Sequence, residues 1–155
     1  MKYGNFFSSR RRAFTVYEIL IVIGIIVLLS AITIPYINKF QPNLKLNAAA
    51  RGLTADLRYA QQLTITEQVL HLVSLDIASG SYSLLRVDAA TTTVKSVDLP
   101  LSVSFNAAST TVSQVRFNSY GGVVSGSVGQ IFLTNTNSKN QLINIKPSGY
   151  VELSN

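Results

Sequence analysis

The sequence contains no cysteine, which excludes disulfide bonds, thiolate metal sites and cysteine nucleophiles. Any folded domain of this chain must therefore be held together by packing alone. Charged residues are also few, at 13% of the chain, whereas apolar residues make up 47%. Much of the apolar excess lies in one block near the N-terminus. At 155 residues, the chain has room for one modest globular domain and one further element.

The formal net charge of +6 would suggest nucleic acid or an anionic membrane as a partner. Its placement weakens that interpretation. Four of the thirteen basic residues lie near the N-terminus, namely Lys2, Arg10, Arg11 and Arg12. A chain beginning at Phe14 would carry nine basic and seven acidic residues, for a net charge of +2.

Residues 19–38 are 20 consecutive uncharged residues, and most of them are apolar. As a helix they would extend over roughly 30 Å, which is enough for one membrane span. All the basic residues near the start of this run precede it. The positive-inside rule therefore predicts a cytoplasmic N-terminus and a C-terminal part on the far side of the membrane.

An ordinary secretory signal peptide is the alternative interpretation of a basic segment followed by an apolar run. The best cleavage site at the end of the run lies near Ala31, but Leu29 stands where a small residue is needed. Glu18 also lies at the head of the run, where an unpaired carboxylate carried towards the bilayer centre would cost roughly 3 kcal/mol. Glu18 therefore requires a cation.

Two cations are near Glu18 in the sequence. One is Arg12, and the other is the amino group that cleavage between Ala13 and Phe14 would create, with a pKa of about 8. Phe14 and Glu18 are four residues apart, so the two charges could meet within one helix. Each could instead pair with the opposite group of a neighbouring chain, in which case the pair would set the register of an assembly.

The segment Arg12–Glu18, followed by the apolar run, resembles a type III prepilin signal. The resemblance implies that a prepilin peptidase cuts between Ala13 and Phe14, that Phe14 is N-methylated, and that Glu18 directs subunit docking. Pro35 matches the family's proline within the anchor helix, where it would kink the helix. Ala13 departs from the usual glycine but is an accepted small substitute.

The resemblance also implies where the chain acts and with which partners. It predicts a single-pass protein of the bacterial inner (cytoplasmic) membrane, with its N-terminus inside, that enters an extracytoplasmic filament. The expected partners are other pilins or pseudopilins, the prepilin peptidase and the inner-membrane assembly platform. Secretion pseudopili, type IV pili and competence filaments all use this anchor, so the sequence does not distinguish them. An unrelated signal-anchored surface protein, with Ala13–Phe14 left intact, is the competing interpretation.

After Pro42 the sequence returns to helical spacing, interleaved with the polar residues Arg51, Asp56 and Arg58. The apolar positions recur at three and four residues: Leu46, Ala49, Ala50, Leu53, Leu57 and Ala60. We expect this stripe to pack against a head domain. The predicted organisation is a leader over 1–13, a transmembrane and assembly helix over 14–38, an amphipathic continuation over 39–67 and a β-rich head over 68–155.

The sequence of the head alternates between apolar and polar residues, which predicts seven or eight short antiparallel strands with one polar face each. Apolar residues alternate with polar ones at Leu101, Val103 and Phe105, at Val115 and Phe117, and at Ile143 and Ile145. Turns are predicted at Ser79–Ser81, Tyr120–Gly122, Ser125–Ser127 and Pro147–Gly149. The predicted fold class is α+β, with a long N-terminal helix packed on an antiparallel, pilin-like sheet.

Three later segments, 53–63, 115–121 and 143–151, are similar to the branch of minor pseudopilin H of type II secretion and related minor pilins. This resemblance implies a low-copy structural subunit that helps to initiate or cap a filament.

No catalytic constellation is recognisable, so we expect no enzyme, no cofactor and no metal site. The lone His71 lies in a strand-like run. The acidic residues of the head are isolated from one another in the sequence: Asp76, Asp88, Asp98 and Glu152. The glycines lack the spacing of a phosphate-binding loop.

Some minor pilins of this branch are DNA receptors, which makes a DNA-binding minor pilin of a transformation filament the alternative function. In this chain the candidate contacts are Lys139 and Lys146, with Tyr150 as a stacking partner. Glu152 stands where that function would favour a basic residue. Two lysines release few counterions, so DNA binding is predicted to be weak and DNA is an unlikely partner.

Overall fold

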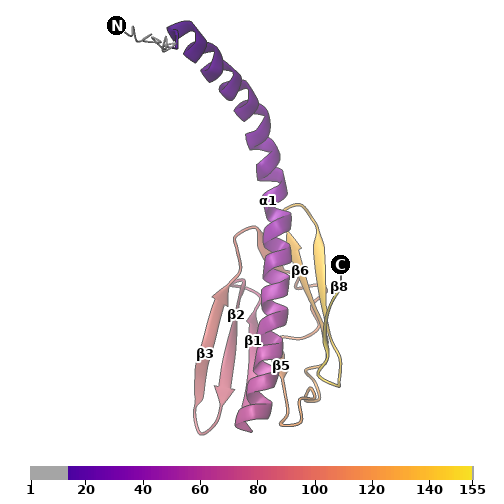
Figure 1. Cartoon of the computed structure of the whole chain (residues 1–155). Helices are drawn as coiled ribbons and strands as arrows, with labels where there is room; N and C mark the ends of the chain where they lie inside the picture. The colour runs from indigo at the N-terminus through magenta and orange to yellow at the C-terminus, as the bar shows by residue number, and fades with distance from the viewer. Residues whose placement is uncertain (1–13, 155) are drawn as a thin grey trace, which may run out of the picture. The chain divides into compact units, whose positions relative to one another are not determined.

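The computed structural model describes residues 14–154, which form one long helix and eight strands (Figure 1). The helix, α1, spans Val16–Glu67. The strands are β1 (Leu70–Asp76), β2 (Ser81–Val87), β3 (Thr91–Asp98), β4 (Val103–Phe105), β5 (Gln114–Arg116), β6 (Gly129–Asn135), β7 (Asn140–Ile145) and β8 (Val151–Ser154). The backbone divides into two compact units, Met1–Asn38 and Lys39–Asn155.

The first unit contains the start of α1, which is capped by a local motif. The Thr15 Oγ1 accepts a hydrogen bond from the Glu18 backbone N–H at 3.2 Å. A threonine followed by a glutamate three residues later, just before an apolar run, is the spacing of a capping box. Glu18 also places a negative charge in the first turn of α1, where it interacts favourably with the helix dipole.

The apolar segment of the first unit has a mean hydropathy of 2.7 over its best window, with none of that window buried. By length and composition, α1 can cross a membrane. The hydroxyls of Ser30 and Thr33 donate to the carbonyls of Ile26 and Leu29, at 2.7 and 2.8 Å. These polar groups are thus satisfied within the helix, as an apolar environment requires.

The second half of α1 packs on the head through the predicted stripe. Leu53, Leu57 and Ala60 are completely buried, and Ala49 is half-buried. Leu46 and Ala50 extend the same buried face. The prediction of a packing stripe is therefore confirmed.

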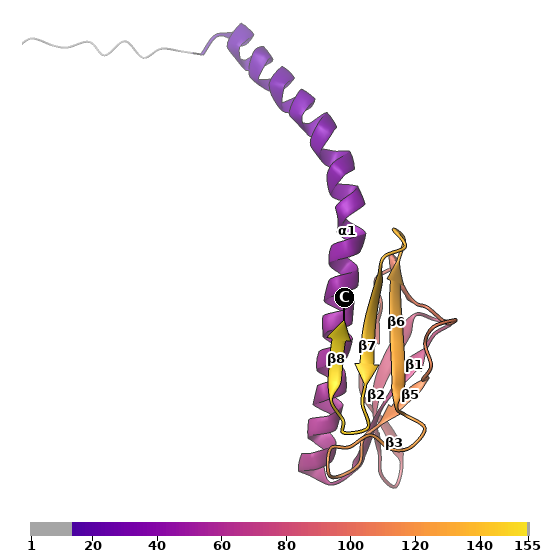
Figure 2. The ribbon, with the colours of Figure 1, turned by 90° about the vertical axis from the view of Figure 1, so that its right-hand side faces the viewer.

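The strands form two antiparallel sheets rather than the single sheet that the sequence suggested. The first sheet has the order β3-β2-β1-β5, and the second has the order β4-β6-β7-β8. Buried side chains from both sheets and from α1 form one apolar core. The second sheet lies in front of the first in Figure 2. The α+β fold class, with a long helix packed on antiparallel strands, is confirmed.

One strand prediction was wrong in detail. The alternation placed Leu101 in the core beside Val103 and Phe105, but Leu101 is fully exposed. The Val103 N–H bonds to the Pro100 carbonyl at 2.7 Å, so residues 100–103 form a turn that directs Leu101 outwards. β4 begins only after this turn, and its two apolar residues are buried as predicted.

The four predicted turns are confirmed. Each contains one glycine with a positive φ, namely Gly80, Gly121, Gly126 and Gly149.

Candidate functional site

The predicted processing and docking residues lie at the start of the described chain. Ala13 is outside the described residues. Phe14 is 73% exposed and precedes the helix, and Glu18 is also exposed. Among residues 14–154, Glu18 forms no ion pair, so its carboxylate is available to a cation from elsewhere. Pro35 lies inside α1, and the kink predicted there stays a prediction.

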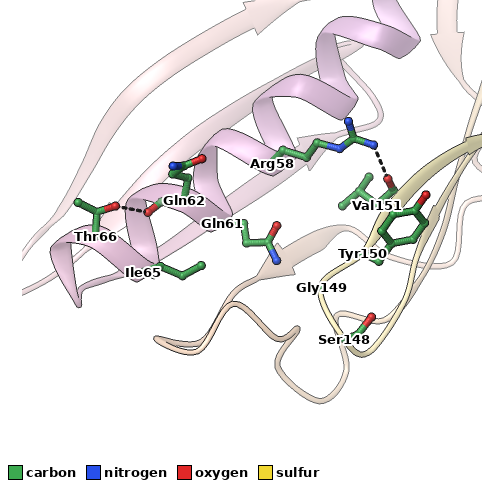
Figure 3. A pocket seen from close by; sticks show the side chains of 9 residues that line it. All are labelled: Arg58, Gln61, Gln62, Ile65, Thr66, Ser148, Gly149, Tyr150 and Val151. Atoms are coloured by element: carbon green, nitrogen blue, oxygen red, sulfur yellow. Dashed lines mark hydrogen bonds between the residues drawn. The ribbon is translucent and has the colours of Figure 1, made fainter.

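A groove of about 590 Å³ lies in the second unit, between the last turns of α1 and the turn that joins β7 to β8 (Figure 3). It is open to solvent and combines polar side chains with the apolar side chains of Ile65 and Val151 and the ring of Tyr150. Its lining consists of Arg58, Gln61, Gln62, Ile65, Thr66, Ser148, Gly149, Tyr150 and Val151.

Two helix side chains fasten the sheet to α1 at this groove. Arg58 donates from its guanidinium to the Val151 carbonyl at 2.9 Å, as Figure 3 shows. The Gln61 amide donates to the Gly121 carbonyl at 2.5 Å. One bond therefore reaches the start of β8 and the other reaches the turn after β5, so the end of α1 orders two separate segments.

Both the backbone conformation and the lack of space require glycine at position 149. The φ angle of Gly149 is +84°, a value that residues with a side chain rarely adopt. A Cβ at this position would lie 1.9 Å from the Gly121 carbonyl oxygen and 2.3 Å from the Gln61 amide nitrogen. The two turns and α1 therefore lie so close together at position 149 that a side chain would not fit there.

The structure brings together two of the three residues proposed for DNA contact, Lys146 and Tyr150, and separates Lys139 from them. Lys146 lies 5.2 Å from the centre of the Tyr150 ring and forms an ion pair with Glu152 at 3.0 Å. Lys139 precedes β7 and Lys146 follows it, so they lie at opposite ends of that strand, roughly 20 Å apart. The paired Lys146 and the distant Lys139 do not form a common phosphate-binding surface.

Asp56 is the buried centre of a polar cluster that the sequence analysis missed. Its carboxylate accepts a hydrogen bond from the Tyr82 hydroxyl at 2.8 Å and pairs with the Lys95 Nζ at 2.7 Å. Burial raises the pKa of Tyr82 well above its usual range, and the bond to Asp56 adds to this effect. The cluster ties α1 to β2 and to the edge strand β3.

Asp56 is buried together with the apolar stripe, although the sequence analysis listed it only among the polar residues interleaved with that stripe. Asp56 stands three residues after Leu53 and four before Ala60, which is the spacing of a core-facing position. This spacing was the signal that could have revealed it. Its partner Lys95 is distant in the sequence and gave no such signal.

His71 is buried in β1, next to the end of α1. Its Nδ1 lies 2.9 Å from the Val69 carbonyl, and its Nε2 lies 3.6 Å from a Glu67 carboxylate oxygen. Its backbone N–H donates to the Thr64 hydroxyl at 3.1 Å. These contacts stabilise the short connection between α1 and β1.

The acidic residues of the head also have local roles. The Asp76 carboxylate accepts bonds from the backbone N–H groups of Ser79 and Ala78, both at 3.1 Å, which lower its pKa. Asp88 is 3.5 Å from Arg86, and Glu152 pairs with Lys146. Over residues 14–154, no three histidine, aspartate or glutamate side chains group as metal ligands would.

Known proteins with the same fold are pilins and pseudopilins. The type IV minor pilin FimU of Pseudomonas aeruginosa is 16% identical, with a TM-score of 0.60 over 75% of this chain and 92% of that one. The minor pseudopilin EpsH from the type 2 secretion system of Vibrio cholerae is 10% identical, with a TM-score of 0.61 over 71% of this chain and 96% of that one. No curated protein sequence matches the chain significantly.

The sequence model of the type II transport protein GspH family matches residues 49–149. This match includes α1 from residue 49 onwards, all four strands of the first sheet, and strands β4, β6 and β7 of the second sheet. Because it covers more than half of the chain, this protein belongs to the GspH family of type II transport proteins.

Proposed function

We propose that this chain is a minor structural subunit that helps to initiate or cap a type II secretion pseudopilus or a related type IV pilus-like filament. The observation that carries the proposal is the contrast along α1. Its second half packs into the head core, whereas its apolar first half has no buried residue in its most hydrophobic window. The first half therefore needs a membrane or neighbouring chains around it.

The exposed apolar surface is large enough to drive insertion and assembly. Leu20 is 66% exposed, Leu28 67% and Ile32 74%. Burying one such side chain contributes about 1.5 to 3 kcal/mol. The membrane first supplies that burial, with the N-terminus inside and the head outside the inner membrane. Helices of neighbouring subunits then replace part of the lipid in the filament.

Processing by a prepilin peptidase would prepare the chain for assembly. A cut between Ala13 and Phe14 leaves an amino group four residues before the unpaired Glu18. In a filament, Glu18 then pairs with the Phe14 amino group of a neighbouring subunit, and N-methylation keeps that amine basic. The assembly platform is the expected site of this step.

The minor role is supported by family membership and by the names of its structural relatives. FimU is described as a minor pilin and EpsH as a minor pseudopilin. A subunit that starts or caps a filament is needed once for each filament, whereas a building block is needed throughout.

The first experiment is mass spectrometry of the N-terminus after co-expression with a prepilin peptidase. We expect a mature terminus at N-methylated Phe14. An intact leader, or a terminus near Ala31, would contradict the proposed processing.

The second experiment tests the docking role of Glu18. We expect Glu18→Ala to be cleaved normally but to be depleted from sheared filaments. Thr33→Ala changes another exposed polar residue of the same helix and is the matched control. Normal incorporation of Glu18→Ala would refute the docking role.

Initiation and capping are tested by deleting the chain and counting filaments. An initiator predicts fewer filaments of ordinary length, and immunogold labelling of the head should mark filament ends. Labelling along the whole shaft would identify a building block instead.

A further inference from the structure

Four basic residues that form no ion pair within the described part of the chain lie on the part of α1 that directly follows the apolar segment and in the loop before β7. We define them as the basic collar: Lys39, Lys45, Arg51 and Lys139. We propose that the basic collar binds anionic phospholipid headgroups of the leaflet from which α1 emerges. The inference rests on the membrane anchoring in the proposed function and adds a lipid partner for the head.

The collar differs from most other basic residues of the head in lacking acidic partners. Arg86, Lys95 and Lys146 all form ion pairs with carboxylates. Within the described part of the chain, no collar residue does.

The sequence explains this difference. It has no acidic residue between Glu18 and Asp56, and none between Asp98 and Glu152. The collar charge is therefore available to an external anion.

Lys139 reaches the collar because its loop is fastened to the helix. The Asn137 side chain donates to the Lys39 carbonyl at 2.9 Å, and the Asn135 side chain donates to the Asn43 side chain at 2.8 Å. The Asn135 oxygen in turn accepts the Lys139 backbone N–H at 2.9 Å. The loop is thus held beside the segment Lys39–Asn43, and this order lowers the entropy cost of binding a headgroup.

A groove of about 540 Å³ opens beside this loop. Arg51 and Lys139 supply its charge, and it also contains amide side chains that can bond to phosphate or glycerol oxygens. Its lining consists of Asn43, Leu46, Asn47, Arg51, Lys139, Asn140, Gln141 and Leu153.

Exposed apolar residues favour a lipid surface over a soluble anion. Phe40 and Leu44 are each 54% exposed, and they are interleaved with Lys39 and Lys45 on α1. Phe and Leu combined with Lys or Arg on one helix are typical of segments that lie at the membrane interface. Binding of a free phosphate or of an acidic soluble protein would not explain why exposed apolar residues are interleaved with these cations.

The distance of each helix residue of the collar from Lys39 predicts how strongly it contributes to lipid binding. Lys45 lies about 9 Å beyond Lys39, and Arg51 about 18 Å beyond it, at 1.5 Å per residue. Electrostatic attraction to the membrane surface decays over a Debye length of about 8 to 10 Å. Lys39, Lys45 and Lys139 should therefore contribute more than Arg51.

The test uses the full chain in vesicles, with a dye on a single introduced cysteine, because the native chain has none. Thr136→Cys places the dye in the loop of Lys139, and Ser148→Cys places it at the other end of β7. The vesicles contain phosphatidylcholine alone or with phosphatidylglycerol, plus a lipid that carries a headgroup quencher. Flotation first verifies that α1 anchors the chain in both.

We expect quenching at position 136 to be at least about twofold stronger with phosphatidylglycerol, and to lose that difference in high salt. Position 148 should show no such difference. Combining Lys45→Glu with Lys139→Glu should abolish the difference, and Arg51→Glu should reduce it less.

Equal quenching at position 136 in the two vesicles would overturn the proposal. So would loss of the difference on adding inorganic phosphate at low ionic strength, because that would identify a site for free phosphate. A chain that fails to float would instead contradict the anchoring in the proposed function.

Discussion

The two halves of α1 have the same secondary structure but opposite surroundings. Residues 16–38 expose nearly every side chain, whereas residues 39–67 contribute a buried stripe to the head core. Helix formation and helix packing are thus separate properties in this chain. The second half gains its packing energy from the head, and the first must gain it from lipid or other subunits.

Composition differs between the halves in the same way. The first half is rich in isoleucine and valine, which are moderate helix formers in water. In a membrane, the helix satisfies all backbone polar groups, so this preference matters little. The second half uses alanine, leucine, arginine and glutamine, which favour helices in water.

The largest effect on the stability of the head is expected at Gly149, in the turn that lies against Gln61 of α1. Gly149→Ala should destabilise the head by about 4 kcal/mol, because the new Cβ collides with the Gly121 carbonyl and the backbone is strained. Hydrogen exchange of the full chain in micelles, measured against denaturant, should show lost protection in the head only. Gly126→Ala has the same φ of +84° but no atom within 4 Å of the new Cβ, so it should cost only about 1 kcal/mol. Equal effects would contradict the role of the contact.

A matched pair of truncations tests the contrast directly. Leu57→Ala, at a fully buried position, should cost the head about 3 kcal/mol through lost burial and a cavity. Ile26→Ala, at a position 57% exposed, should change head stability by less than about 0.5 kcal/mol. The same exchange measurement reports both. A large effect of Ile26→Ala on the head would show that the two halves are coupled.

The start of the head half should be less sensitive. Asn43→Ala removes the acceptor of the Asn135 side chain and should cost about 1 kcal/mol. Gln41→Ala, an exposed neighbour, is the control. Exchange in the loop between β6 and β7 should rise with Asn43→Ala alone. No rise would mean that the loop is held by its other bonds.

An effect of similar size is expected at alkaline pH. The raised pKa of Tyr82 means that the folded head retains the Tyr82 proton where the unfolded chain, with a pKa near 10, releases it. This contribution to stability is fully present below pH ~10 and is lost as the pH rises above that value. Between pH ~10 and ~11, the wild type should lose about 1 kcal/mol more than Tyr82→Phe in denaturant titrations. Identical pH slopes would refute this contribution.

Local patterns predicted much of the fold because they report local physics. The spacing from Leu46 to Ala60 revealed the buried face of α1, and the glycines revealed the turns. The division into two sheets depends on pairings between distant strands, such as β1 with β5, that no short pattern encodes. Leu101 was misplaced because its turn overrides the alternation.

The candidate sites were predictable to different degrees. Phe14 and Glu18 belong to a contiguous motif, so their proposed roles followed from it. Tyr82 and Lys95 reach Asp56 only in the folded chain, and the contact of Gly149 with Gly121 also depends on tertiary structure. Separating Lys139 from Lys146 likewise required knowing that β7 lies between them.

The helix cap at Thr15 also affects how easily a protease could bind the chain near Phe14. The first helical residue is Val16, so Phe14 and Thr15 are non-helical even though a long helix follows. A peptide bond must leave a helix before a protease can bind it in an extended form. Because the helix starts two residues after Phe14, a protease that binds Phe14 and Thr15 would not have to unwind them. For the proposed cut between Ala13 and Phe14, a helix that began earlier would add this unwinding cost.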